Sequence, residues 1–229
     1  SLIEQILQDG IKLMGAKGGS AVLMNSKNGE ILSLVSFPEF DPNDRPKNLF
    51  KANPADSPIF NRAVQGIYEL GSVFKIFTVA LALDEGLVNL GTELKTVGPL
   101  RVGGRTISDH KYFGPSLTVE EIIVKSSNIG TVRIANKIGS ELLKEFYKSL
   151  GLLDKTSLEL PETRLTIPQS PKKWKSLDTA TASYGHGIAV SPIHLAAAYS
   201  SLVNGGYKVS PTLVLKEKEV IYETAKKPK

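Results

Sequence analysis

The chain has 229 residues, of which 41% are hydrophobic and 22% charged, proportions that are ordinary for a globular protein with a substantial core. Its 28 basic and 23 acidic side chains give a formal net charge of +5 and are interleaved along the sequence, so no nucleic-acid-binding surface is predicted. The absence of cysteine excludes disulfides and thiolate metal sites. No apolar run reaches the roughly 18 residues of a membrane span, and the first residues do not resemble a signal peptide, so we expect any anchor to lie outside this chain.

The first part of the chain is predicted to form a helix, a hairpin and a loop. Apolar residues recur at helical spacing over residues 2–14 and stop at glycines, which predicts an opening helix. Residues 20–24 and 31–37 are apolar runs of strand length, and the turn between them contains Asn28-Gly29, a strong hairpin signal. Repeated prolines then predict a long irregular loop over residues 38–61.

The middle of the chain is predicted to alternate helices with short strands. An apolar helix is expected from Ser72 to Gly86, followed by strand candidates at residues 100–102 and 105–107. Thr118 and Glu121 form a capping-box pattern, which predicts a short helix to about residue 125.

The part of the chain after residue 128 is predicted to be helical around a loop-rich region at residues 154–178. Ser191-Pro192 resembles an N-cap followed by a proline at the first helical position. The predicted helices of this part cover residues 129–139, 141–150 and 192–205, and residues 209–215 are expected to be extended.

The helix that follows Ser72 contains the clearest candidate for chemistry. From residue 73 to residue 83 only Lys75 and Thr78 are polar, and a helix that is apolar on nearly every face belongs in a core, so Lys75 is expected to be buried. Ser72 precedes Lys75 by one turn, which places both side chains on one face. Burial lowers the pKa of a lysine and would let Lys75 accept the proton of Ser72, so the pair predicts an acyl-transfer site.

A second polar cluster supports this interpretation. Ser-x-x-Lys is common by itself, but Ser126-Ser127-Asn128 also interrupts two predicted apolar helices. With their surroundings these motifs resemble the transpeptidase domain of class B penicillin-binding proteins, a family for which Ser-x-x-Lys is a known signature. The resemblance extends over nearly the whole chain and includes residues 19–35, 38–43, 61–63, 68–75, 125–130, 184–192 and 204–206.

The resemblance implies a fold and a set of residue roles. The fold would be mixed α/β (α+β), of the penicillin-binding protein transpeptidase and serine β-lactamase type, with a helical cluster on an antiparallel sheet that is incomplete at its C-terminal end. Residues 1–229 would form a single, truncated domain. Ser72 would be the nucleophile and Lys75 its general base. Ser126 would relay protons to the leaving amine, and Asn128 would hydrogen-bond the amide of the substrate.

The resemblance also implies a function in cell-wall synthesis. The chain would belong to a peptidoglycan D,D-transpeptidase that cross-links stem peptides through a serine acyl-enzyme and is acylated by β-lactams. Ser-x-Asn at residues 126–128 and the stretch 185–192 are more similar to septal, division-specific enzymes than to elongation enzymes. Expected partners are stem peptides ending in D-Ala-D-Ala, β-lactams and septal membrane proteins. The expected location is the extracytoplasmic side of the bacterial inner membrane.

One departure from the family pattern leaves alternatives open. The third motif of the family, Lys-Ser-Gly or Lys-Thr-Gly, occurs nowhere in the chain. We favour a truncated piece of an active enzyme, with low activity by itself, over a protein that has lost the motif. A non-catalytic penicillin-binding sensor or scaffold, and a D,D-carboxypeptidase or β-lactamase that transfers the acyl group to water, remain alternatives.

The other candidate residues favour structural roles. Asp109 and His110 are neighbours whose side chains diverge, so they are interpreted as loop residues rather than parts of a triad. His186 and His194 lack the spacing of metal ligands, and the Gly185-His186-Gly187 segment lacks the context of a dinucleotide site. Neither a metal nor a cofactor is predicted.

Overall fold

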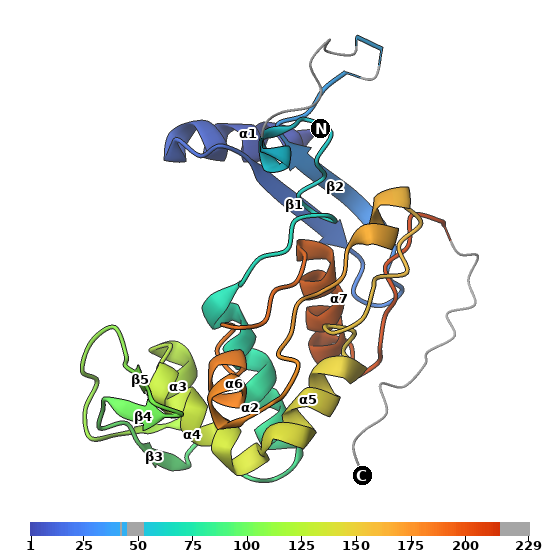
Figure 1. Ribbon diagram of the computed structural model, residues 1–229. Helices are drawn as coiled ribbons and strands as arrows, with labels where there is room; N and C mark the ends of the chain where they lie inside the picture. The colour runs from blue at the N-terminus through green and yellow to red at the C-terminus, as the bar shows by residue number, and fades with distance from the viewer. Residues whose placement is uncertain (42, 45–52, 216–229) are drawn as a thin grey trace. The chain divides into compact units, whose positions relative to one another are not determined.

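The chain folds into two compact units. The computed structural model describes residues 1–41, 43–44 and 53–215 (Figure 1). The first unit comprises residues 1–68, 150–168 and the described residues from 190 onward, and the second comprises residues 69–149 and 169–189. The single domain predicted over residues 1–229 stays a prediction, since two compact units can belong to one domain.

The first unit begins with the predicted helix and hairpin. Helix α1 (Leu2–Met14) starts with a capping box between Ser1 and Glu4 and ends at a glycine in the left-handed conformation. Strands β1 (Gly19–Met24) and β2 (Ile31–Phe37) pair in antiparallel register, with Gly19 opposite Phe37. Both α1 and α7 (Pro192–Val203) contact β1. These predicted elements are confirmed.

A small apolar core holds the first unit together. Ala63, Val64, Leu158 and Ile193 are buried against one another, and partly buried residues of the hairpin pack on them. Short 3-10 helices, η1 (Pro54–Asp56) and η3 (Pro161–Leu165), lie in the regions predicted as loops.

Ser191 is the N-cap of α7 and is followed by a proline in the first turn, as predicted, but two details of the first unit differ from expectation. The Ser191 hydroxyl makes no helix-capping hydrogen bond, because it lies 2.6 Å from Nδ1 of the buried His194 instead. Residues 209–215 form no regular strand, but Thr212 makes an isolated parallel bridge with Glu30. Residues 42, 45–52 and 216–229, which include part of the predicted long loop, lie outside the described residues.

The second unit is a cluster of helices with two short antiparallel pairs. Helix α2 (Lys75–Asp84) contacts three others, and α4 and α6 also pack together (Figure 1). The remaining elements are η2 (Gly71–Phe74), α3 (Val119–Val124), α4 (Asn128–Ile138), α5 (Ser140–Ser149), α6 (Ser176–Ala182), the pair β3 (Glu93–Lys95) with β6 (Ser116–Thr118), and the pair β4 (Leu100–Val102) with β5 (Arg105–Ile107).

The structure refines the predicted boundaries of the second unit. The segment expected to be a helix from Ser72 begins as the 3-10 turn η2 and becomes α-helical only at Lys75. Helix α6 was not predicted, and it begins at the end of the region predicted as a loop and continues beyond residue 178. Strands β3 and β6 were not predicted either. Strands β4 and β5 have the predicted bounds.

Buried aromatic rings support the start of α2. Phe74 and Phe77 pack edge to face against Tyr147 of α5, with ring centroids 5.8 and 6.5 Å from that of Tyr147. Thr78 Oγ1 lies 3.1 Å from the hydroxyl of Tyr147 and donates a hydrogen bond of 2.8 Å to the carbonyl of Ser183. The first turn of α2 is therefore fixed on several sides.

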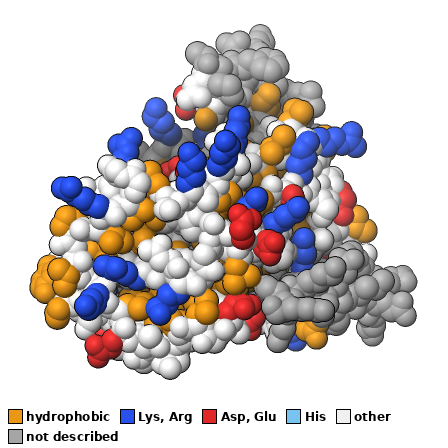
Figure 2. Space-filling model, turned by 60° about the horizontal axis from the view of Figure 1, so that its bottom comes forward, with side chains coloured by type: hydrophobic (Ala, Val, Ile, Leu, Met, Phe, Trp, Pro, Cys, Tyr) orange, Lys and Arg blue, Asp and Glu red, His pale blue; other side chains and the backbone are white. Residues whose placement is uncertain are grey.

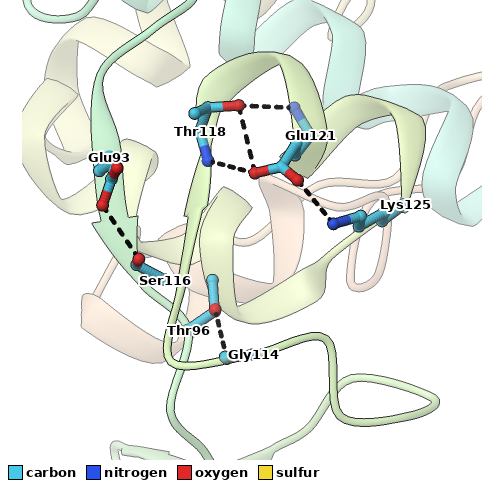
Figure 3. A network of polar contacts seen from close by, with 7 residues as sticks. All are labelled: Glu93, Thr96, Gly114, Ser116, Thr118, Glu121 and Lys125. Carbon is cyan, nitrogen blue, oxygen red and sulfur yellow. Dashed lines mark hydrogen bonds and ion pairs between the residues drawn. The ribbon is translucent and has the colours of Figure 1, made fainter.

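The predicted capping box of α3 is confirmed (Figure 3). The Glu121 amide donates to Thr118 Oγ1 over 3.2 Å, and the Thr118 amide donates to the Glu121 carboxylate over 3.0 Å. Lys125 Nζ donates to the same carboxylate over 2.7 Å, so a charged pair closes the helix at its other end. This short, well-capped helix leads directly to Ser126.

The surface shows no concentration of charge on the side that is drawn. In Figure 2 the Lys and Arg side chains are scattered among neutral and apolar groups and do not merge into one basic patch. Within the described residues, no helix combines the length and apolarity that crossing a membrane requires.

Candidate active site

Lys75 is buried at the first turn of α2, as predicted. Its residue is only 3% exposed, and Nζ donates to the carbonyl of Ser126 over 2.5 Å and to Ser126 Oγ over 2.9 Å. Burial lowers the pKa of Lys75 from 10.5 to about 8, and the negative charge of Asp109 partly opposes this effect. A lysine with this pKa can accept a proton near neutral pH.

Ser72 lies on the turn immediately before Lys75. It belongs to η2, and its residue is exposed. The two predicted reacting groups therefore differ in environment, since the hydroxyl can meet a substrate while the amine is shielded from water.

Ser126 lies at the reversal between α3 and α4, in an uncommon backbone conformation. Its φ is +55°, in the left-handed region that glycine usually occupies at the end of a helix. The amides of Ser126 and Ser127 donate to the carbonyls of Ile123 and Ile122, over 3.1 and 2.9 Å. This closing turn brings both oxygens of Ser126 to Lys75.

Asn128 starts α4 next to this turn. Its side-chain amide donates to the carbonyl of Ser108 over 3.0 Å, and its backbone N–H donates to Asp109 Oδ1 over 2.5 Å. The structure thus brings Lys75 and Ser126 into direct contact, with Asn128 two residues beyond Ser126.

Asp109 is a residue whose role the sequence did not reveal. Its carboxylate accepts hydrogen bonds from the first residues of α4 rather than pairing with His110. Its hydrogen-bond partners lie 18 to 20 residues later in the sequence, so no local spacing predicts the contact.

The loop at residues 185–187 supports the turn that carries Ser72. The Gly71 amide donates to the Gly185 carbonyl over 3.2 Å, and a Cβ at Gly185 would lie 2.1 Å from the Gly71 carbonyl oxygen. The carboxylate of Glu69 accepts from the Gly187 amide over 2.9 Å and lies 3.3 Å from Nδ1 of His186. The close approach of the two backbones leaves no room for a side chain at position 185.

A family comparison agrees with this geometry. The family model of the penicillin binding protein transpeptidase domain matches residues 19–229. The chain belongs to this family. The resemblance to class B penicillin-binding proteins and the mixed α/β fold class predicted from it are thereby confirmed.

Individual members of the penicillin-binding protein family are similar over most of the chain. A probable peptidoglycan D,D-transpeptidase FtsI from Caulobacter vibrioides is 36% identical over 205 residues, which are 89% of this chain and 33% of that protein. The chain thus spans about a third of the length of this relative.

Two solved structures are also similar to this penicillin-binding protein domain. A peptidoglycan glycosyltransferase from Burkholderia ambifaria has a TM-score of 0.82 and 29% identity, covering 96% of this chain and 64% of that one. The transpeptidase domain of penicillin-binding protein 3 from Burkholderia pseudomallei has a TM-score of 0.77 and 28% identity, covering 96% and 61%.

Proposed function

We propose that this chain carries the acyl-enzyme centre of a septal peptidoglycan D,D-transpeptidase. The observation that supports this most strongly is the buried Lys75, which lies one turn after Ser72 and hydrogen-bonds both oxygens of Ser126. The family and the FtsI relative support the same reaction class. We also propose that the two compact units act as one transpeptidase-like domain on the extracytoplasmic side of the membrane.

The proposed reaction is acyl transfer in two steps. Neutral Lys75 takes the proton of Ser72, and Ser72 Oγ bonds to the carbonyl carbon of the terminal D-Ala-D-Ala amide. The amide bond breaks as the proton held by Lys75 passes through Ser126 to the departing amine, and D-alanine leaves. An amine of a neighbouring stem peptide then attacks the ester carbonyl and gives up a proton, which reaches the Ser72 oxygen through Lys75. The ester bond breaks, Ser72 is regenerated and the new amide is the cross-link. Asn128 hydrogen-bonds the amide of the donor peptide.

Product analysis tests this function. Protein from the complete reading frame is incubated with a stem peptide ending in D-Ala-D-Ala and an amine acceptor. We expect release of D-alanine together with the amide product, measured by mass spectrometry. Hydrolysed peptide as the sole product would instead indicate a carboxypeptidase. Covalent penicillin labelling without either product would indicate a sensor or scaffold module.

Substitutions of Ser126 separate backbone strain from chemistry. Ser126→Gly and Ser126→Ala both remove the hydroxyl, so both are expected to slow β-lactam acylation at least about tenfold. Glycine adopts positive φ without strain, so Ser126→Gly should be more stable than Ser126→Ala by about 1 kcal/mol. Urea denaturation and stopped-flow acylation measure the two effects. Equal stability of the two variants would show that the backbone at Ser126 is not strained.

A further inference from the structure

Asp109 connects the loop after β5 to the start of α4. Its Oδ1 accepts hydrogen bonds from the backbone amides of Asn128 and Ile129, over 2.5 and 3.0 Å. Its Oδ2 accepts a hydrogen bond of 2.7 Å from the hydroxyl of Ser127. One carboxylate therefore contacts three consecutive residues.

These contacts satisfy the free end of α4. The first amides of a helix have no partner within it, and a negative charge at this end is stabilised by the helix dipole. The amides of Asn128 and Ile129 are bound by Asp109, and Ser127 Oγ accepts the amide of Gly130 over 2.9 Å. Asp109 and Ser127 together set the direction in which the backbone leaves Ser126.

The direction of this backbone matters for Lys75. The carbonyl that accepts the hydrogen bond from Lys75 Nζ is that of Ser126, and it is part of the peptide bond that joins Ser126 to Ser127. Rotation of that peptide would move the carbonyl away from Lys75. The positive φ of Ser126 means that its turn is held by surrounding contacts rather than by local preference.

We propose that Asp109 is a positioning residue of the acyl-transfer site, whose carboxylate holds the turn at residues 126–128 in the geometry that engages Lys75. The inference rests on the function proposed above and deepens it. Asp109 acts through Ser126 and Lys75 and does not touch the reacting atoms.

The charge of Asp109 gives a second, independent effect. Burial lowers the pKa of Lys75, and the negative charge of Asp109 offsets part of this effect by raising it. On α3, Glu121 and Lys125 are paired with each other over 2.7 Å. Removing the carboxylate should therefore lower the pKa of Lys75, and acylation should reach its plateau at a lower pH. The shift of this pH profile reports the charge of Asp109 near Lys75, whereas the loss of rate reports the position of the turn.

The experiment compares Asp109→Ala and Asp109→Asn with the wild type, in protein from the complete reading frame. The readout is the rate of acylation by a fluorescent penicillin between pH 6 and pH 10. We expect a loss of about 100-fold for alanine, since misplacement of a catalytic group by about 1 Å has effects of that size. Asparagine keeps an oxygen for the amides and should lose less. In both variants the acidic limb should move to lower pH.

Asp178→Ala is the matched control. Asp178 also caps a helix of the second unit, accepting from the amide of Lys175 over 3.0 Å at the start of α6. This variant should lose stability but keep the wild-type acylation rate and pH profile. Amide NMR shifts of Asn128 and Ile129 give a readout without activity, and they should move upfield in Asp109→Ala.

The outcomes separate the inference from the proposed function. Wild-type acylation and an unmoved pH limb in Asp109→Ala would overturn the positioning role. A rate loss that only follows the unfolded fraction, with an unmoved limb, would also overturn it. Absence of Ser72-dependent labelling in the wild type would instead show that the proposed function is wrong.

Discussion

Ser72→Ala is expected to abolish covalent attachment of a fluorescent penicillin. The proposed ester forms through Ser72 Oγ, and alanine offers no atom to which the acyl group could bond. The side chain is exposed on the short turn η2, so its loss should leave the fold unchanged. Intact-mass measurement of protein from the complete reading frame, after incubation with the penicillin, should show one adduct in the wild type and none in the variant.

Ser116→Ala is a suitable control for this result. Ser116 is a serine of the same unit whose hydroxyl donates to Glu93 over 3.0 Å, outside the candidate site (Figure 3). It should acquire the adduct at the wild-type rate. A stable adduct on Ser72→Ala, with melting temperature unchanged, would show that another residue is the nucleophile.

Lys75→Met should reduce acylation by about 100- to 10,000-fold, the usual contribution of a positioned general base. Methionine has a similar length and no basic nitrogen, so it removes proton transfer and the two contacts with Ser126 while still filling the buried space. In the wild type the rate should rise with pH through about 8, because only neutral Lys75 can accept a proton. In Lys75→Met this limb should be absent.

Replacement of Lys75 should slow acylation but raise the stability of the folded chain at neutral pH. Its pKa is about 8 in the folded chain and is ordinarily 10.5, so the unfolded chain binds the proton more tightly. The contribution of Lys75 to stability therefore rises as pH increases from about 8 to 10.5. Lys75→Met should be more stable than the wild type at pH 7, and the difference should shrink at high pH. Urea denaturation at both pH values measures this.

Two results would contradict the role of Lys75. One is acylation of Lys75→Met at a rate within a few-fold of the wild type. The other is a wild-type rate that does not change between pH 6 and pH 9, which would place the essential base on another group. Lys137→Met, on the exposed side of α4, is the matched control and should change neither quantity.

The elements predicted correctly are those whose signals lie within a few residues. Helix α1 has its cap and its terminating glycine close to the apolar positions, and the hairpin has its Asn-Gly turn. Helix α6 is short and rich in threonine and alanine, and it is held by packing on α4, which sequence periodicity does not report. Strands β3 and β6 have three residues each and pair with each other although they lie far apart in the sequence.

The candidate site follows the same rule. Ser72 and Lys75 are related by one helical turn, so their proximity and the burial of Lys75 could be inferred locally. The contact between Lys75 and Ser126 was expected only through the family resemblance. Asp109 reaches Ile129 across 20 residues, and the approach of Gly185 to Gly71 depends entirely on tertiary packing.

The contact between Glu69 and Gly187 also affects the order in which the candidate site can form during synthesis. Glu69 and Gly187 are 118 residues apart, so at about 5 to 20 residues per second a ribosome needs roughly 6 to 24 s to make the chain between them. Lys75 and Ser126 are separated by only 51 residues, so their contact can form earlier. During synthesis Lys75 and Ser126 can therefore come together first. The turn that carries Ser72 gains its final support only after the chain has passed through the first unit and returned to the second.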